Sequence, residues 1–255
     1  MEILKAVILG IIQGLTEFLP VSSSAHLVLF QDVLKVKDAF TLDVFLHFGT
    51  LIAVSIFYWE DIWGMLTFKA KYRKFSLYVI LGSIPAGIIG VFFNDFVERL
   101  FSSLEVSGYA LLFTGLLLWL SDRITNTTRN LAEMKLSDAI VVGVAQALAI
   151  VPGISRSGST IVAGLVKGLD RKLAAKYSFL LSVPVILGAT LFEFKDIMTV
   201  GLVNNSIGEL FFGTLASMIA GYFAIKLLVR LINQERLSFF AYYCWGLGLL
   251  IILLR

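Results

Sequence analysis

A segment near the N-terminus of this chain is repeated, in altered form, just past its middle. Gly10 and Gln13 of the first copy correspond to Gly143 and Gln146 of the second, at an offset of 133 residues. The same offset pairs Tyr109, Gly115, Leu116 and Leu117 with Tyr242, Gly248, Leu249 and Leu250. Because one offset aligns both ends of two halves, we infer an internal duplication. We therefore expect a single domain with repeats at about 1–122 and 136–255 and a link at 122–137.

The composition indicates an integral membrane protein. Hydrophobic residues make up 58% of the chain and charged residues 15%, which leaves too little polar surface for a water-soluble domain of 255 residues. The basic residues are scattered between apolar runs, so the net charge of +3 does not indicate a nucleic-acid partner. A single cysteine, Cys244, excludes a disulfide framework and a cysteine-based metal site. The first apolar stretch contains Gln13 and Glu17 and follows no basic segment, so we do not expect a cleaved signal peptide.

Segment lengths predict the topology of each half. A spanning helix needs about 20 apolar residues, whereas arms of about 11 to 17 residues interrupted by Pro and Ser favour a re-entrant hairpin. The hairpins are expected at 3–34 and 136–169, broken at 20–24 and 152–157. The spans are expected at 40–63, 75–97, 106–121, 174–194, 207–231 and 238–254. Three spans per half invert the second half, so the predicted fold is an all-α polytopic membrane protein with an inverted-topology repeat.

The distribution of basic residues predicts the orientation. Fourteen of the 21 Lys and Arg residues fall on one side of this arrangement and six on the other, and Arg156 lies inside the membrane. Because cytoplasmic loops collect Lys and Arg, both termini are expected outside, and the links at 64–74 and 122–137 inside. The hairpins then enter from opposite faces, and broken helices of this kind meet near the membrane midplane.

Arg156 is the residue that is hardest to explain as structure, because a cation at membrane depth is costly and normally faces a cavity or a partner. Its surroundings resemble an anion site, since free N–H groups at a helix start, hydroxyls and a guanidinium all bind phosphate. The small and hydroxyl-bearing residues of this turn are Ser155, Ser157, Gly158, Ser159 and Thr160. We call the breaks of the two hairpins the first tip (20–24) and the second tip (152–157). The structural alternative is a serine N-cap together with an Arg156–Glu17 pair that holds the two tips together.

The first tip carries candidate metal ligands and catalytic groups. Gln13 and Glu17 are four residues apart on one helical face, and their oxygens suit Mg²⁺ or Ca²⁺. Ser23 and His26 are three apart, so a helical return arm would make them adjacent, either as an activated hydroxyl with a base or as a histidine nucleophile with hydroxyl support. In the first span, Asp43 and His47 are also four apart, and we interpret them as supporting groups of the site or as a structural pair.

Two stretches resemble the signature motifs of a known family. The segments QGLTEFLPVSSSAH (13–26) and PGISRSGST (152–160) are similar to those of the bacterial undecaprenyl-diphosphate phosphatases of the bacitracin-resistance type, and LDVFLHFG (42–49) also fits. The resemblance covers essentially the whole chain. It implies an enzyme that removes the terminal phosphate of undecaprenyl diphosphate and so recycles the lipid carrier of peptidoglycan and other envelope polymers. It also implies that bacitracin competes for this long-chain prenyl diphosphate, that a divalent cation is required, and that the active site opens to the outer face of the bacterial cytoplasmic membrane.

The resemblance assigns roles to individual residues. It places Gln13 and Glu17 at the metal-binding element, Ser23 and His26 at the catalytic hydroxyl and imidazole, and Arg156 at the phosphate-binding arginine. Further substrate-binding residues are expected at Ser22, Ser24, Ser155, Ser157, Gly158 and Thr160.

Two departures from the family pattern bear on these roles. Many members have Glu at position 13, so Gln13 is a weaker candidate ligand and Glu17 becomes the main acidic one. Many members also have Thr-Gly before the histidine, where this chain has Ser24-Ala25, which keeps a hydroxyl but makes the turn less permissive.

The sequence therefore predicts that the lipid tail lies between the halves and that the diphosphate enters between the two tips. The nucleophile is Ser23, with His26 as its base, or His26 itself, or a water activated by one of them. The alternative is a lipid-phosphate flippase, because inverted repeats with broken helices are typical of transporters. Ser23, His26 and Glu17 favour a phosphatase over a flippase, since moving an anion would require Arg156 but no nucleophile. A purely structural role is the weakest interpretation.

Overall fold

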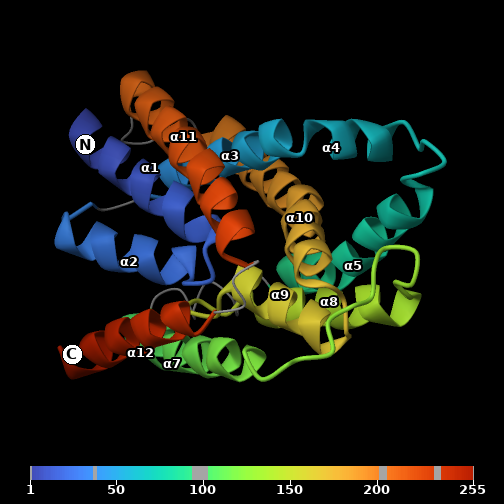
Figure 1. Cartoon of the computed structure of the whole chain (residues 1–255). Coiled ribbons are helices and arrows are strands. Elements are labelled where there is room, and N and C mark those ends of the chain that lie inside the picture. Colours follow the sequence, from blue (N-terminus) through green and yellow to red (C-terminus); the bar gives the residue numbers. More distant parts are fainter. Residues whose placement is uncertain (1, 37–38, 94–102, 201–205, 233–236, 255) are drawn as a thin grey trace.

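The computed structural model describes residues 2–36, 39–93, 103–200, 206–232 and 237–254, with only the backbone of residues 192–200. Within these ranges the chain forms eleven α-helices, and its only β-type pairing is one isolated bridge (Figure 1). The helices are α1 (Ile3–Phe18), α2 (Ser23–Val33), α3 (Phe40–Phe57), α4 (Trp59–Leu66), α5 (Arg73–Phe92), α7 (Leu104–Ser121), α8 (Leu136–Leu148), α9 (Arg156–Val166), α10 (Arg171–Val200), α11 (Ile207–Ile232) and α12 (Ser238–Leu253). The expected all-α class is confirmed.

Five of these helices are long and apolar enough to cross a membrane, namely α3, α5, α7, α10 over Arg171–Leu191, and α11. The chain is therefore a multi-pass membrane protein. The sixth expected span, α12, is an apolar helix of 16 residues, shorter than the other five. Residues 94–97 of the second expected span lie outside the described residues.

The span expected at 40–63 is wrong in its C-terminal part. The helix α3 ends at Phe57, and Tyr58, with φ −109° and ψ 31°, separates it from α4. The short helix α4 carries the acidic residues Glu60 and Asp61 in its first turn and exposes Trp59 and Trp63, whose rings stack. Because an amphipathic tryptophan-bearing turn is more stable at the membrane surface than within it, the spanning helix stops before this segment.

Two pairs of short helices form hairpins, α1 with α2 and α8 with α9 (Figure 1). Their arms have 16, 11, 13 and 11 residues, so each arm is too short to cross a bilayer unaided. The first break contains Pro20 and Ser22, whose φ of 68° is left-handed. The second contains Gly153 at φ 95°, where a Cβ atom would also collide with the Ser107 carbonyl of α7. The expected breaks are confirmed in place, within a few residues of the predicted bounds.

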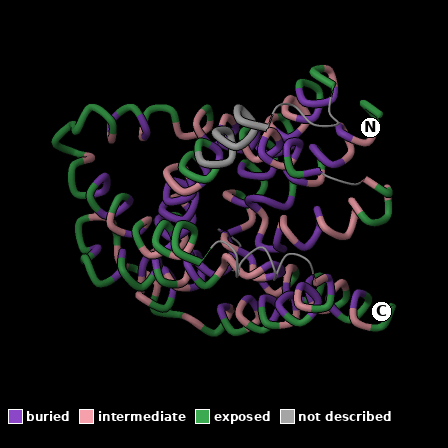
Figure 2. The backbone as a smooth tube through the Cα atoms, turned by 180° about the vertical axis from the view of Figure 1, so that it is seen from behind, coloured by how far each residue is buried: buried purple, intermediate pink, exposed green. Residues whose placement is uncertain are grey.

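Each hairpin packs against a spanning helix from the opposite half of the chain. The helix α1 lies along α11, and α8 lies along α5, while α3 contacts α10 near the middle of the bundle. Figure 2 shows buried residues gathered toward the interior of the bundle and exposed residues along its outer parts. The closest approaches are at glycines: a Cβ on Gly10 would overlap the Gly213 carbonyl, and a Cβ on Gly143 would overlap that of Gly82. Small residues let helix backbones approach in this way within membranes.

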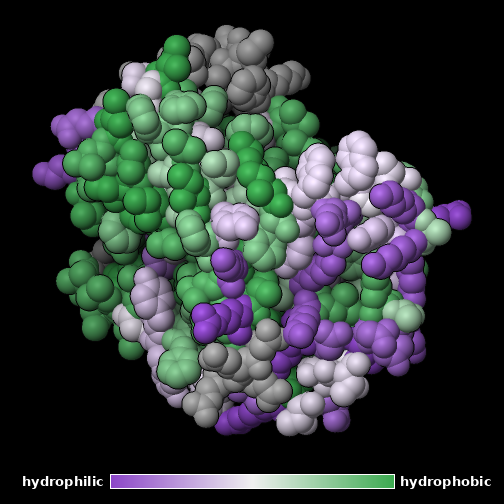
Figure 3. All heavy atoms as spheres, turned by 45° about the horizontal axis from the view of Figure 1, so that its top comes forward, coloured by the Kyte–Doolittle hydropathy of each residue, from purple (hydrophilic) through white to green (hydrophobic). Residues whose placement is uncertain are grey.

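The two termini lie at the same end of the bundle (Figure 1). The connection between α4 and α5 and the link between α7 and α8 lie at the opposite end. Exposed basic side chains gather at that second end, where Lys69, Lys71, Arg73 and Lys74 follow α4. Figure 3 shows polar residues concentrated there and apolar residues over much of the remaining face.

The glycine contacts predict that a methyl group added at Gly143 destabilises the protein. Gly143→Ala should separate α8 from α5 and lower the free energy of unfolding by about 1–3 kcal/mol, the usual cost of overpacking. The measurement is the thermal unfolding midpoint of the detergent-solubilised protein. Gly87→Ala is the matched control on α5, because a Cβ atom there meets nothing within 4 Å. Equal midpoints for the two variants would contradict the packing argument.

Candidate active site

The breaks of the two hairpins contact each other inside the bundle. The Ser157 hydroxyl donates to the Leu19 carbonyl at 3.1 Å, and the Gly153 N–H donates to the Ser24 hydroxyl at 3.4 Å. Ser24 also shares a hydrogen bond with Ser22 at 3.1 Å. The first and second motifs, more than 120 residues apart in the chain, therefore form one polar junction.

A buried ion pair crosses this junction. Arg156 Nη2 lies 2.9 Å from Glu17 Oε1, and the two side chains are 15% and 6% exposed. The other carboxylate oxygen, Glu17 Oε2, accepts hydrogen bonds from Ser23 Oγ at 2.6 Å and Gln13 Nε2 at 3.0 Å. The structure thus brings three of the predicted site residues, Gln13, Ser23 and Arg156, together around the carboxylate of a fourth, Glu17.

Arg156 is held from its second side by α10. Its Nη1 donates to the Ser178 carbonyl at 3.4 Å, and the Ser178 hydroxyl shares a 2.6 Å hydrogen bond with Thr160. Thr160 in turn donates to the Arg156 carbonyl at 2.7 Å. The guanidinium is therefore fixed between the first tip and α10, and its longer contact with Ser178 leaves donor capacity for an anion.

The start of α9 is capped and braced. Ser155 accepts from the Gly158 N–H at 3.1 Å as the N-cap, and its hydroxyl also lies 3.2 Å from that of Ser157. Behind the turn, Thr114 of α7 accepts from the Ser155 N–H at 3.1 Å and donates to the Gly153 carbonyl at 2.9 Å. This bracing fixes the direction in which the first N–H groups of α9 point.

The expected pairing of Ser23 with His26 is not what the structure shows. Ser23 donates to Glu17, whereas His26 Nδ1 lies 2.7 Å from the Ser22 carbonyl and His26 Nε2 lies 2.7 Å from the Tyr243 hydroxyl. Spacing of three on a helix brings two residues onto one face, but a carboxylate is a stronger acceptor for the Ser23 hydroxyl than an imidazole. The two predicted catalytic groups therefore form their hydrogen bonds with different residues.

Asp43 and His47 interact through the Asp43 main-chain carbonyl, and the Asp43 side chain bonds to α2. Gln31 Nε2 of α2 donates to Asp43 Oδ1 at 2.7 Å, and His47 Nδ1 lies 2.8 Å from the Asp43 main-chain carbonyl. Asp43 thus links α3 to the hairpin, and His47 is oriented by the backbone of its own helix. Both residues belong to the surroundings of the first tip.

The donor set of the junction suits a hard cation. Gln13 Oε1 is buried and has no hydrogen-bond partner, although the Nε2 of the same side chain is bonded to Glu17. An orphaned amide oxygen beside a carboxylate and a hydroxyl offers oxygen ligands only. The part of the chain that the structure describes contains no group of three His, Cys, Asp or Glu residues able to hold a metal. The residues therefore fit Mg²⁺ or Ca²⁺ only if substrate oxygens and water complete the shell.

Comparison with known proteins identifies the family. Residues 6–250 match the family described as bacitracin resistance protein BacA. The chain belongs to this family. It is 53% identical to the undecaprenyl-diphosphatase of Halothermothrix orenii over 100% of this chain and 98% of that protein. It is 45% identical to those of Alkaliphilus metalliredigens and Methanobrevibacter smithii, each over 99% of this chain and 98% of the relative. The family predicted from the two motifs is confirmed.

Three residues of this BacA-family site were not predicted from the sequence. They are Thr114 of α7, Ser178 of α10 and Tyr243 of α12. Thr114 and Ser178 are buried polar residues in apolar spans, a weak signal because such hydroxyls also bond to their own helix backbone. Tyr243 reaches His26 across 217 residues of sequence, and no local pattern indicates that contact.

The bracing role of Thr114 predicts a difference between two conservative variants. Thr114→Val leaves the buried Ser155 N–H and Gly153 carbonyl without their partner, which should cost about 1–3 kcal/mol of the free energy of unfolding. Thr114→Ser keeps both hydrogen bonds and should remain close to the wild type. The thermal unfolding midpoints of the two variants in detergent provide the test. If Val and Ser lower the midpoint equally, the hydroxyl does not brace the turn.

Proposed function

We propose that this protein hydrolyses undecaprenyl diphosphate to undecaprenyl phosphate and inorganic phosphate. Family membership and relatives of that activity over the whole chain length support this assignment. The observation that carries it is the junction itself, where a buried arginine, a carboxylate and a hydroxyl from two hairpins converge. The reaction returns the lipid carrier to envelope polymer synthesis, and its substrate is the lipid for which bacitracin competes.

The second tip binds the terminal phosphate. Arg156 supplies guanidinium donors, and the main-chain N–H groups of Arg156 and Ser157, at the first two positions of α9, lack intrahelical acceptors. An incoming phosphate replaces part of the charge compensation that Glu17 gives Arg156 in the free protein. We assign the hydroxyls of Ser155 and Ser157, and those of Ser22 and Ser24 on the first tip, to substrate binding. Thr160 supports this site through Arg156, because its hydroxyl donates to the Arg156 carbonyl.

Ser23 is the nucleophile that the geometry favours. Its hydroxyl already donates to Glu17 at 2.6 Å, so Glu17 takes the proton as Ser23 Oγ bonds to the terminal phosphorus. The bond from phosphorus to the bridging oxygen breaks, and undecaprenyl phosphate leaves with the electron pair. Water then attacks the phosphoserine and its proton passes to His26 Nε2 by way of the hydroxyl bonded to that nitrogen, while Ser23 recovers its proton from Glu17 and inorganic phosphate is released. His26 thus serves the second step, consistent with its separation from Ser23.

A divalent cation, Mg²⁺ or Ca²⁺, would be held by Glu17 and the free Gln13 Oε1. When bound, it stabilises negative charge on the phosphate and bridging oxygens. Because Gln13 is neutral, the two proposed protein ligands give the cation a single negative charge, that of Glu17. The diphosphate of the substrate would supply the other negative charges around the cation.

Two observations support an inverted-repeat architecture with re-entrant hairpins. The glycine contact of α1 with α11 recurs as the contact of α8 with α5, and Gly10 and Gly143 are related by the offset of 133 residues. The termini lie at one end of the bundle and the basic α4–α5 connection at the other. We propose that the basic end faces the cytoplasm, that both termini and the active site face the outer side of the bacterial cytoplasmic membrane, and that the lipid tail lies between the halves.

Loss of the arginine tests the phosphatase directly. Arg156→Ala should lower phosphate release from undecaprenyl diphosphate roughly a hundredfold or more, because a preorganised cation that stabilises transition-state charge is removed. Release by the purified protein in detergent is the measurement. Arg73→Ala, which removes an exposed arginine at the other end of the molecule, should act like the wild type. Near-normal release by Arg156→Ala would overturn the assignment. A folded wild type that moves the lipid across vesicles without releasing phosphate would instead indicate a flippase.

The proposed cation ligands make a separate prediction. Chelation with EDTA should abolish release, and Gln13→Ala should raise the Mg²⁺ concentration for half-maximal activity roughly tenfold, which corresponds to about 1.4 kcal/mol of binding free energy. Gln146→Ala is the matched control, because Gln146 is the buried counterpart of Gln13 in the second half. An unchanged Mg²⁺ requirement in Gln13→Ala would exclude Gln13 as a ligand.

A further inference from the structure

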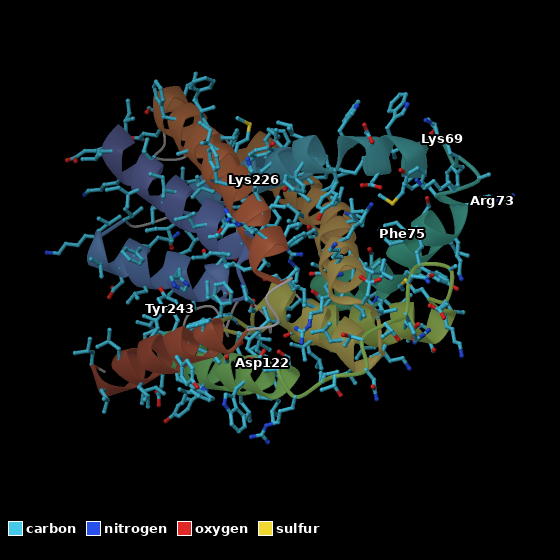
Figure 4. The ribbon with its side chains drawn as sticks, viewed as in Figure 1. Lys69, Arg73, Phe75, Asp122, Lys226 and Tyr243 are labelled. Carbon is cyan, nitrogen blue, oxygen red and sulfur yellow. The ribbon has the colours of Figure 1, made fainter. Side chains whose placement is uncertain are left out.

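The imidazole of His26 is held from both sides. Its Nδ1 lies 2.7 Å from the Ser22 carbonyl oxygen, and its Nε2 lies 2.7 Å from the Tyr243 hydroxyl. The imidazole and phenol rings are nearly parallel, at 5° with centroids 5.6 Å apart. His26 is 2% exposed, whereas Tyr243 is half-exposed between α12 and α2 (Figure 4). The next residue, Cys244, also contacts the first tip, since its Sγ lies 3.7 Å from the Pro20 carbonyl.

These partners determine the tautomer of His26. A carbonyl oxygen can only accept, so Nδ1 carries the proton and donates it to Ser22. Nε2 is then the nitrogen with the lone pair, and the Tyr243 hydroxyl donates to it. The nitrogen that can act as a base is therefore the one that Tyr243 holds.

The second half of the chain lacks this arrangement. At the offset of 133 residues, His26 corresponds to Ser159 and Tyr243 corresponds to Ala110. The buried Gln13, by contrast, is retained as Gln146. Tyr243 therefore differs between the halves together with its partner His26, which indicates a task specific to the catalytic half and not a general need of helix packing.

We propose that Tyr243 is a catalytic proton relay of the phosphatase, an inference that rests on the function proposed above. Its hydroxyl donates to the only lone pair of Nε2 and keeps His26 in the Nδ1–H tautomer. When water attacks the phosphoserine, the Tyr243 oxygen takes the proton of the water as Tyr243 gives its own proton to Nε2. The relay affects this proton transfer and leaves binding of the diphosphate to Arg156 unaffected.

Kinetics of a matched pair of variants test this role. Tyr243→Phe removes the hydroxyl and keeps the ring, and it should lower kcat about tenfold, as expected for one lost hydrogen bond. KM should fall with kcat, because only the second step is slowed, and kcat/KM, which reports the first step, should stay unchanged. Tyr242→Phe is the control, because Tyr242 is the adjacent exposed tyrosine and its ring packs against Trp245. Equal kcat values for the two variants would overturn the proposal, and so would a rise in KM without a loss of kcat.

A spectroscopic measurement tests the same contact without turnover. The chain has two histidines, so ¹⁵N-imidazole spectra contain two sets of signals, and His47→Gln assigns those of His26. In the wild type we expect the Nδ1–H tautomer with a hydrogen-bonded Nε2, and in Tyr243→Phe a downfield shift of Nε2. An unchanged Nε2 signal would overturn the proposal even if the wild type released no phosphate. Failure of the proposed function and failure of this inference are therefore distinguishable.

Discussion

The arrangement of the site depends on the buried ion pair between Glu17 and Arg156. Removing either charge would leave the other uncompensated in a low-dielectric interior, which typically costs several kcal/mol. The two residues come from different hairpins, so neither tip can bury its charge without the other. The same pair leaves the site ready for a phosphate, because an anion that binds Arg156 frees the carboxylate for a hydroxyl proton and for a cation.

The charged pair can exist only because the two breaks end inside the protein. Hairpin arms of 11 to 16 residues are too short to span a bilayer, and glycine contacts with α11 and α5 bring the backbones close enough for the tips to touch inside the bundle. Helix breaks expose unpaired backbone groups, and these are tolerated in a membrane where protein side chains satisfy them. Here Thr114 and Ser157 do so for the second and first tips, respectively.

The sequence was sufficient to predict the hairpins, the meeting of the two tips and the family. These features depend on segment length, on matches at the 133-residue offset and on long motifs, all of which can be read directly from the sequence. It was not sufficient for the partners of Ser23 and His26, because helical spacing indicates which side chains share a face. It does not indicate which acceptor Ser23 prefers or which distant helix approaches His26. The boundary between α3 and α4 was missed for a related reason, since composition alone did not separate an interfacial tryptophan turn from the end of a span.

Under the proposed inverted repeat, differences between the two halves explain how a repeated scaffold can form one site. Ser23 and Arg156 occupy equivalent positions at the offset of 133 residues, and both bond to Glu17. A symmetric pair of arginines would repel each other at the junction, and a symmetric pair of serines would leave Glu17 without a cation. Only unlike residues at this position give the carboxylate both a proton donor and a counter-charge. On this proposal the repeat supplies the geometry, and the chemistry depends on the positions at which the two halves differ.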